Sequence, residues 1–123
     1  MRFKDFIQQL DQIQVDEFAV QALNEHFQCQ LPQEAQKVVS FQTEGFFFDD
    51  SIGYHLLSLK QILQASRELQ VDFQFIRLMP VMDISSNDFI CFDYSLNTWC
   101  VYNIVDETRF LPAQHIGEYQ EWM

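Results

Sequence analysis

The chain has 123 residues, a mass of 14.7 kDa and 18 acidic against 7 basic side chains, which gives a formal net charge of −11. This length fits one domain, and a hydrophobic content of 48% with 13 Phe excludes intrinsic disorder. The charge disfavours nucleic acid and anionic membranes as partners, because both are bound through Lys and Arg. A basic protein would be attracted, although acidity for solubility alone is the simple alternative.

Glycine and cysteine usage narrows the class of protein further. The three glycines are Gly45, Gly53 and Gly117, too dispersed for a Walker or GxGxxG phosphate loop. The cysteine number is odd and the spacings are not those of a metal site. The first residues run into an amphipathic pattern rather than a signal sequence, and no apolar run is long enough for a bilayer. We therefore expect a soluble cytoplasmic protein with reduced thiols.

The first third of the chain has helical periodicity. Apolar residues at helical spacing predict a helix over residues 3–13. Asp16 is a suitable N-cap for a second helix, whose buried face is expected to hold Phe18, Ala22, Leu23 and Phe27. Pro32 favours the first turn of a third helix, which we expect to end by Gly45.

The middle of the chain combines turn, strand and helix signals. The segment 49–51 is a turn, and residues 54–57 read as a short strand. Ser58 and Gln61 match a capping box, which predicts a helix toward Gln70. Residues 73–79 are rich in β-favouring side chains and predict a strand that Pro80 closes.

The last third predicts an antiparallel sheet. Strands are expected over residues 88–94 and 99–105 with a hairpin loop between them, and residues 116–123 form a short helix. A symmetric loop would place Cys91 and Cys100 on opposite faces of the sheet, where they act as small buried hydrophobes rather than a disulfide. These elements predict a single α+β domain over residues 1–123, with a mainly antiparallel sheet backed by helices.

A search for chemistry finds no catalytic set, metal site or cofactor motif. His26 and Cys29 are spaced as HxxC, which supplies fewer ligands than zinc needs. Acidic residues cluster at the expected strand ends: Asp83, Asp88, Asp93, Asp106 and Glu107. Paired carboxylates suit acid–base chemistry or Ca²⁺, whereas aspartates at strand ends more commonly shape turns.

The negative charge is concentrated in the second part of the chain. Residues 78–123 hold one base, Arg109, against seven acids, and residues 1–77 hold six bases against eleven. An acidic docking face is therefore expected near the sheet edges, although a solvated rim is an equally natural reading. The candidate contact residues are Asp83, Asp88, Asp106 and Glu107. Asp93 is expected instead to satisfy backbone groups.

An ordered set of short motifs resembles the SUKH superfamily, the Smi/Knr-type domains. The motifs are Leu31-Pro32 before a helix, Glu44-Gly45 after it, Leu56-Leu57-Ser58-Leu59-Lys60-Gln61-Ile62, Leu78-Met79-Pro80-Val81, and Asn87-Asp88-Phe89-Ile90-Cys91-Phe92-Asp93. The resemblance runs from about residue 16 to 122. Glu44, Gln61 and Asn87 stand where the family usually has Asn, Glu and Gly, which leaves the subfamily open.

The resemblance implies a function as well as a fold. It implies a helix-backed sheet without catalytic residues, similar to bacterial immunity proteins that bind and neutralise toxin domains, often nucleases. Fungal members regulate cell-wall synthesis and signalling. The expectation is therefore a non-catalytic immunity protein for a basic toxin domain. The alternatives are a regulatory or scaffold domain with another protein partner and, less favoured, an enzyme that uses clustered carboxylates with a metal.

Overall fold

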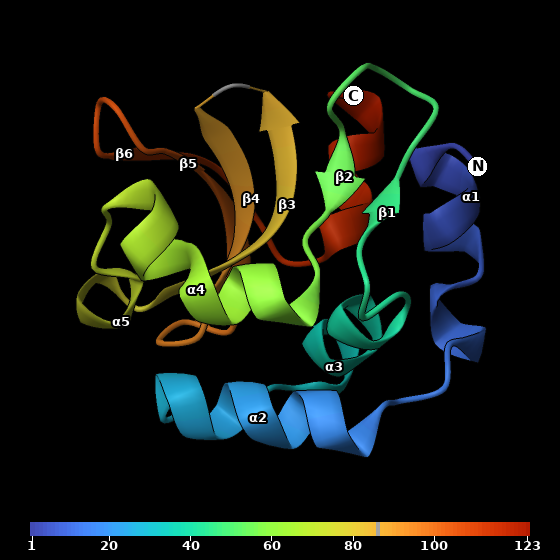
Figure 1. Cartoon of the computed structure of the whole chain (residues 1–123). Coiled ribbons are helices and arrows are strands. Elements are labelled where there is room, and N and C mark those ends of the chain that lie inside the picture. Colours follow the sequence, from blue (N-terminus) through green and yellow to red (C-terminus); the bar gives the residue numbers. More distant parts are fainter. Residues whose placement is uncertain (86) are drawn as a thin grey trace.

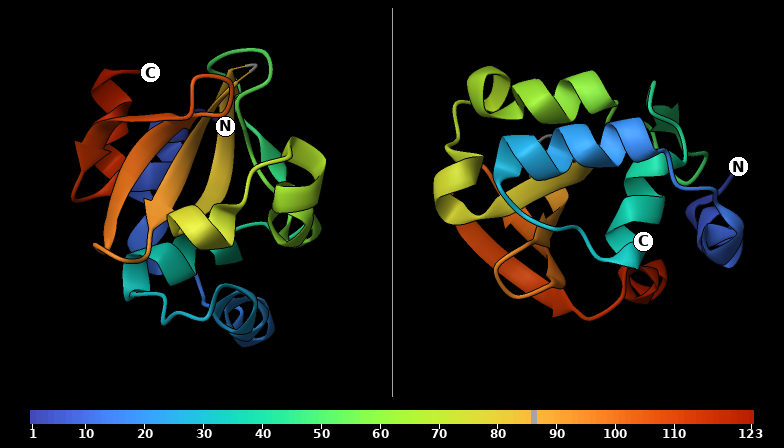
Figure 2. Two further views of the ribbon diagram at one scale, coloured as in Figure 1. Left: turned by 90° about the vertical axis from the view of Figure 1, so that its left-hand side faces the viewer. Right: turned by 90° about the horizontal axis from the view of Figure 1, so that it is seen from below.

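The computed structural model describes residues 1–85 and 87–123 and has an α+β fold, as predicted (Figure 1). The helices in these ranges are α1 (Phe3–Gln8), α2 (Glu17–Phe27), α3 (Gln33–Ser40), α4 (Leu59–Leu69) and α5 (Phe73–Ile76), with the 3-10 helices η1 (Leu10–Gln12) and η2 (Ile116–Glu121). The strands are β1 (Phe46–Phe47), β2 (His55–Leu56), β3 (Leu78–Ser85), β4 (Asp88–Asp93), β5 (Thr98–Asn103) and β6 (Thr108–Ala113). They form one antiparallel sheet in chain order, and α2, α3 and α4 gather on one side of it (Figure 2).

Local hydrogen bonds start the helices where the sequence predicts. The Asp16 carboxylate accepts a hydrogen bond from the backbone N–H of Ala19 at 3.1 Å, so it caps α2. In α4 the Ser58 hydroxyl accepts from the Gln61 backbone N–H at 3.0 Å, and the Gln61 side chain accepts from the Ser58 N–H at 2.8 Å. Both caps are confirmed. The second fixes where α4 begins, directly after β2.

The buried face of α2 differs from the expected one. Phe18 is 77% exposed, whereas Ala19 and Val20 are buried together with Leu23 and Phe27. The expected stripe was therefore misplaced at its start. Because Asp16 caps the helix, Phe18 lies in its first turn and points to solvent. The next two residues, Ala19 and Val20, face the core instead.

Two assignments near the sheet are corrected. Residues 73–76 form the one-turn helix α5 instead of a strand, because the Asp72 carboxylate caps it by accepting from the Phe75 N–H at 3.1 Å. Strand β3 starts later and continues through Pro80, where a register shift relieves the missing N–H. Strand β6 was not predicted. It is an edge strand whose first five residues are exposed, so it lacks the apolar pattern of a buried strand.

The β4–β5 hairpin differs from the symmetric register by two residues, since Trp99 pairs with Phe92 instead of Tyr94, and a slip of two residues leaves every side chain on the same face of the sheet. Asp93 pairs with Thr98, so Cys91 and Cys100 lie directly opposite each other and share a face of the sheet. The expectation that they point to opposite faces was wrong. Both thiols are free and buried. Burial raises the pKa of Cys91 well above its usual value and that of Cys100 to about 11, which keeps both protonated and confirms their role as packing residues.

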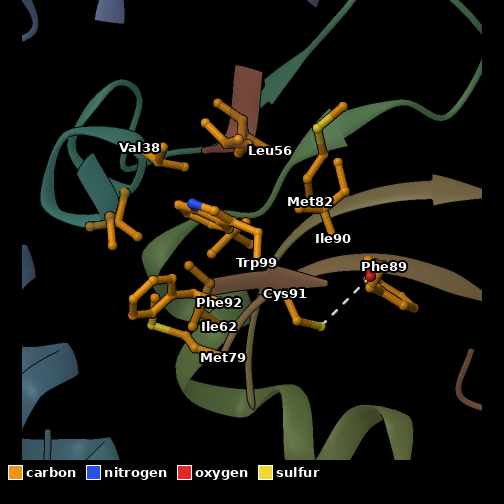
Figure 3. Packing of buried hydrophobic residues seen from close by; sticks show 14 of the residues in the cluster. Val38, Leu56, Ile62, Met79, Met82, Phe89, Ile90, Cys91, Phe92 and Trp99 are labelled. Carbon is orange, nitrogen blue, oxygen red and sulfur yellow. Dashed lines mark hydrogen bonds between the residues drawn. The ribbon is translucent and has the colours of Figure 1, made fainter. Parts of the chain in front are cut away.

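The core is centred on the helix-covered face of the sheet. The Trp99 indole is buried among Val38, Leu56 and Phe92, and its ring centroid lies 5.0 Å from that of Phe92 (Figure 3). The side chain of Cys91, on β4, points away from the Trp99 indole of β5 (Figure 3). The core therefore joins α3, β2 and the central strands into one unit.

A second aromatic cluster fixes the start of the sheet. Phe46 and Phe48 face inward on either side of Phe47, and their ring centroids are 5.3 Å apart. Phe6 of α1 contacts Phe41 after α3 and Phe48, with centroid distances of 5.0 and 5.5 Å. The alternation of a strand leaves Phe47 exposed on the outer face.

Candidate protein-binding site

A single row of side chains crosses the sheet near one end. The register pairs Phe47 with His55, His55 with Asp83, Asp83 with Phe89, and Phe89 with Tyr102. Directly paired residues of antiparallel strands project from the same face. The pairing therefore brings an acidic residue from β3 beside a histidine from β2 and an aromatic ring from β4.

Helix α4 runs beside this row and closes a groove of about 470 Å³, here named the α4 groove. Its lining residues are His55, Leu57, Lys60, Gln61, Gln64, Ala65, Glu68, Leu69, Asp83 and Phe89. The backbone N–H of Leu57 donates to the Val81 carbonyl at 2.9 Å, which holds the link between β2 and α4 against β3. The groove thus combines apolar side chains with carboxylates, amides and a histidine.

Asp83 is the acidic residue of the sheet that lines the groove. Its side chain is partly buried, and among the described residues no base lies within 4.0 Å of its carboxylate. Burial raises the pKa of the Asp83 carboxyl, while the charge of His55 and the backbone N–H of Ser85 act in the opposite direction. The fold therefore holds a carboxylate in a partly dehydrated position, with His55 and Lys60 at the same groove but no ion pair to either among the described residues.

His55 is held between a backbone carbonyl and an aromatic ring. Its Nδ1 lies 2.9 Å from the Gly53 carbonyl oxygen, which can only accept a hydrogen bond, so Nδ1 is the donor. The Phe47 ring stacks on the imidazole with a centroid distance of 4.5 Å and an interplanar angle of 23°. Phe47 is 67% exposed, so an apolar surface lies next to the groove.

Asp88 has a different local role. Its Oδ1 accepts from the Asn103 amide at 2.8 Å, and its Oδ2 accepts from the Ser85 hydroxyl at 3.2 Å. The Asn103 side-chain oxygen in turn accepts from the backbone N–H groups of Val105 and Asp106. Asp88 therefore positions the turn between β5 and β6 through Asn103.

Asp106 and Glu107 lie in that β5–β6 turn, and both are exposed. The turn places Glu107 in the left-handed region with a φ of 56°. The register puts all four predicted contact residues near one end of the sheet, because Asp88 pairs with Asn103 at the start of this turn. The structure does not bring them into one pocket: of the four, Asp83 alone lines the α4 groove.

Asp93 is an internal acid, as expected. Its Oδ1 accepts from the backbone N–H groups of Ser95 and Leu96 at 3.0 and 3.1 Å, and from the Ser95 hydroxyl at 2.7 Å. Its Oδ2 pairs with the Arg109 guanidinium at 2.8 Å, and the same guanidinium donates to the Ile76 carbonyl. This pair ties β6 to the end of β4 and to α5.

The α4 partners of Asp83 are functional candidates that sequence reasoning missed. Gln64, Glu68 and Leu69 reach the groove because β2 pairs with β3, which carries α4 alongside Asp83. That pairing joins segments almost thirty residues apart and leaves no local pattern in the chain. The capping box predicted where α4 starts, but nothing in the sequence predicted what it faces.

Two hollows that are larger than the α4 groove have less suitable chemistry. A shallow depression of about 550 Å³ along α2 is lined largely by Gln, Glu and Asn side chains. A second, of about 500 Å³, lies between the end of α2 and the β4–β5 loop, with Arg77, Tyr94 and Asn97 among its lining residues. Within residues 1–85 and 87–123, no three His, Cys, Asp or Glu side chains converge in a way that could hold a metal ion.

No family model matches the chain, and a search of curated proteins finds no match. In the part of the chain that the structure describes, every helix is too short or too polar to cross a membrane.

Proposed function

We propose that this chain is a non-catalytic protein-binding module: an immunity protein of the SUKH type that binds a basic toxin domain and neutralises it in the cytoplasm. The antiparallel sheet with helices packed on one side agrees with the architecture that the motif resemblance implies. The family has no catalytic residues, so its members act through their surfaces. The proposal therefore depends on what surface this chain offers.

The observation that carries the proposal is that Arg109 is bound by groups within the protein and does not neutralise the acidic residues at the end of the sheet. It is the one base among residues 78–123, and it is held by Asp93 and the Ile76 carbonyl. Asp83, Asp106 and Glu107 form no ion pair with Arg109 or with any other base of the described residues. A surface with an excess of negative charge at one end of the sheet attracts a positively charged partner and speeds its association.

The test uses the gene that lies directly beside the one encoding this chain. The C-terminal domain of that neighbour is expressed in a bacterial host, alone and together with this protein. We expect the domain alone to stop growth and co-expression to restore it. The purified pair should form a one-to-one complex whose affinity falls as salt is raised, because charged surfaces are screened.

Two results would contradict the proposal. The first is a toxic neighbour whose effect is not relieved by co-expression and which forms no complex with this chain. The second is a complex whose affinity is insensitive to salt, which would remove the electrostatic basis. A stable complex with a neighbour that is not toxic would favour the regulatory or scaffold function over immunity.

A further inference from the structure

We propose that the α4 groove is the receptor for one arginine side chain of the basic partner, with the guanidinium group bound to Asp83. This inference rests on the proposed function and deepens it, since it names the element of the partner that is recognised. It also assigns Asp83 a contact role that Asp88, with its internal hydrogen bonds, does not share.

The charges in the groove favour a cation. Asp83 and Glu68 supply two carboxylates, and Lys60 supplies one ammonium group at the same groove. Glu68 is paired with Arg67 at 3.5 Å, but both side chains are more than 60% exposed. Such a surface pair contributes little and rearranges readily, so Glu68 is free to turn toward an incoming cation.

The remaining lining fits the long side chain of arginine. Leu57, Ala65, Leu69 and Phe89 offer apolar contacts for its methylene groups, as long basic side chains commonly pack their stems on apolar surfaces. The Gln64 amide also lines the groove and adds a further acceptor. Arginine presents five N–H donors in a planar fork, whereas lysine presents three from a single point, so arginine satisfies more of these acceptors.

The state of Asp83 explains why a guanidinium binds there. The carboxylate is partly buried and has lost hydration without forming an ion pair to any base of the described residues. An arginine that docks side-on returns two charge-assisted hydrogen bonds to this one group. Asp106 and Glu107 are exposed and keep their hydration, so the same arginine gains less from pairing with them.

The test needs no identified partner. The full-length protein, labelled with ¹⁵N, is titrated with the peptide Ac-Gly-Arg-Gly-NH₂ at low salt and followed by two-dimensional NMR. The matched ligand is the same peptide with citrulline, which keeps the shape of arginine but lacks its charge. We expect saturable shifts of the amides of His55, Asp83 and Phe89 with the arginine peptide, and at least about tenfold weaker binding of the citrulline and lysine peptides.

Two variants locate the site. Asp83→Asn should weaken binding of the arginine peptide by about tenfold or more, while the matched Asp106→Asn should bind like the wild type. Lys60→Gln should strengthen binding a few-fold, because it removes the competing ammonium group. The NMR spectrum of each variant without peptide reports directly whether the fold is kept.

Equal binding of the arginine and citrulline peptides would overturn the inference, as would shifts centred on the β5–β6 turn that Asp83→Asn leaves unchanged. Tighter binding of the lysine peptide would equally reject arginine as the occupant. Failure here is distinguishable from failure of the immunity proposal, because the growth test does not depend on the peptide. Growth rescue that persists in Asp83→Asn, together with no peptide binding, would reject the groove and leave the immunity function standing.

Discussion

Asp83 and Asp93 lie on neighbouring strands of one sheet but differ in burial and in the hydrogen bonds and ion pairs of their carboxylates. Asp93 is 3% exposed and has its oxygens filled by two backbone N–H groups, a hydroxyl and a guanidinium. Asp83 is partly buried in a groove, and no base within the described residues lies within 4.0 Å of it. The single base of this part of the chain thus serves the internal acid.

The difference separates acidic residues whose internal hydrogen bonds stabilise the fold from presented acids, that is, acidic residues left available for a partner. Glu34 belongs to the first group, since its carboxylate accepts from the Trp99 indole at 2.7 Å and from the Ile116 N–H at 2.9 Å. Removing the charge of such a residue should cost stability and leave recognition intact. Removing the charge of a presented acid should do the reverse, so one isosteric substitution at each position tests the distinction.

The largest expected effect on stability is that of Asp93→Asn. The amide cannot pair with Arg109, and its N–H₂ group would face the guanidinium. Because Arg109 is 42% exposed, solvent relieves part of the cost, and we expect a loss of about 2 kcal/mol in the free energy of unfolding. Urea unfolding followed by circular dichroism measures it, with Asp106→Asn as the matched control. Equal stability of the two variants would break the comparison.

A smaller loss is expected for Glu34→Gln. One oxygen of the amide can still accept from Trp99 and Ile116, but the contact of the second carboxylate oxygen with His115 Nδ1 at 3.1 Å is weakened. We expect a loss of about 1 kcal/mol by the same urea measurement. Glu107→Gln is the control and should change stability by less than about 0.5 kcal/mol. A neutral Glu34→Gln would remove this residue from the internal acids.

The smallest effect, opposite in sign, is expected for Asp83→Asn. The pKa of Asp83 is raised above its usual 3.8 in the folded state, so the native protein binds this proton more tightly than the unfolded chain. Stability of the wild type should therefore fall, relative to the variant, as the pH rises from below 3.8 through the higher folded pKa. The variant should be equally stable at low pH and slightly more stable at neutral pH.

The groups around Asp83 determine how the stability difference between the wild type and Asp83→Asn changes with pH. Burial opposes the charged carboxylate, whereas His55 on β2 and the backbone N–H of Ser85 favour it, and Lys60 and Glu68 of α4 line the same groove with opposite charges. Unfolding curves of the two proteins at several pH values supply the measurement. A variant that becomes less stable than the wild type as pH rises would show that Asp83 is an internal acid after all.

Sequence reasoning predicted the elements whose signals are local. The caps at Asp16 and Ser58 depend on residues three positions apart, and both are present. Residues 73–76 were mistaken for a strand because their side chains favour β structure, while a single cap from Asp72 selects a helical turn. The register of Cys91 and Cys100 depends on how the hairpin turn closes, which composition does not determine.

The candidate site was predictable only in part, for the same reason. Asp83 could be named because it is an acid near the end of a strand in a part of the chain with one base. Its setting could not, because the groove requires β2 to pair with β3 and α4 to lie beside both. Asp88 was named on the same grounds, yet its carboxylate is used to position Asn103. The type of residue indicates a charge, and the long-range contacts decide how it is used.

The proposed toxin partner, the C-terminal domain of the neighbouring gene's product, offers the most direct test through its affinity for three forms of the protein. Isothermal titration would compare the wild type, Asp83→Asn and Asp106→Asn at one fixed salt concentration. The account predicts a loss of about thirtyfold or more for Asp83→Asn, as expected for a desolvated charge pair, and a change of no more than a few-fold for Asp106→Asn. Equal affinities for all three, or a larger loss for Asp106→Asn, would contradict it.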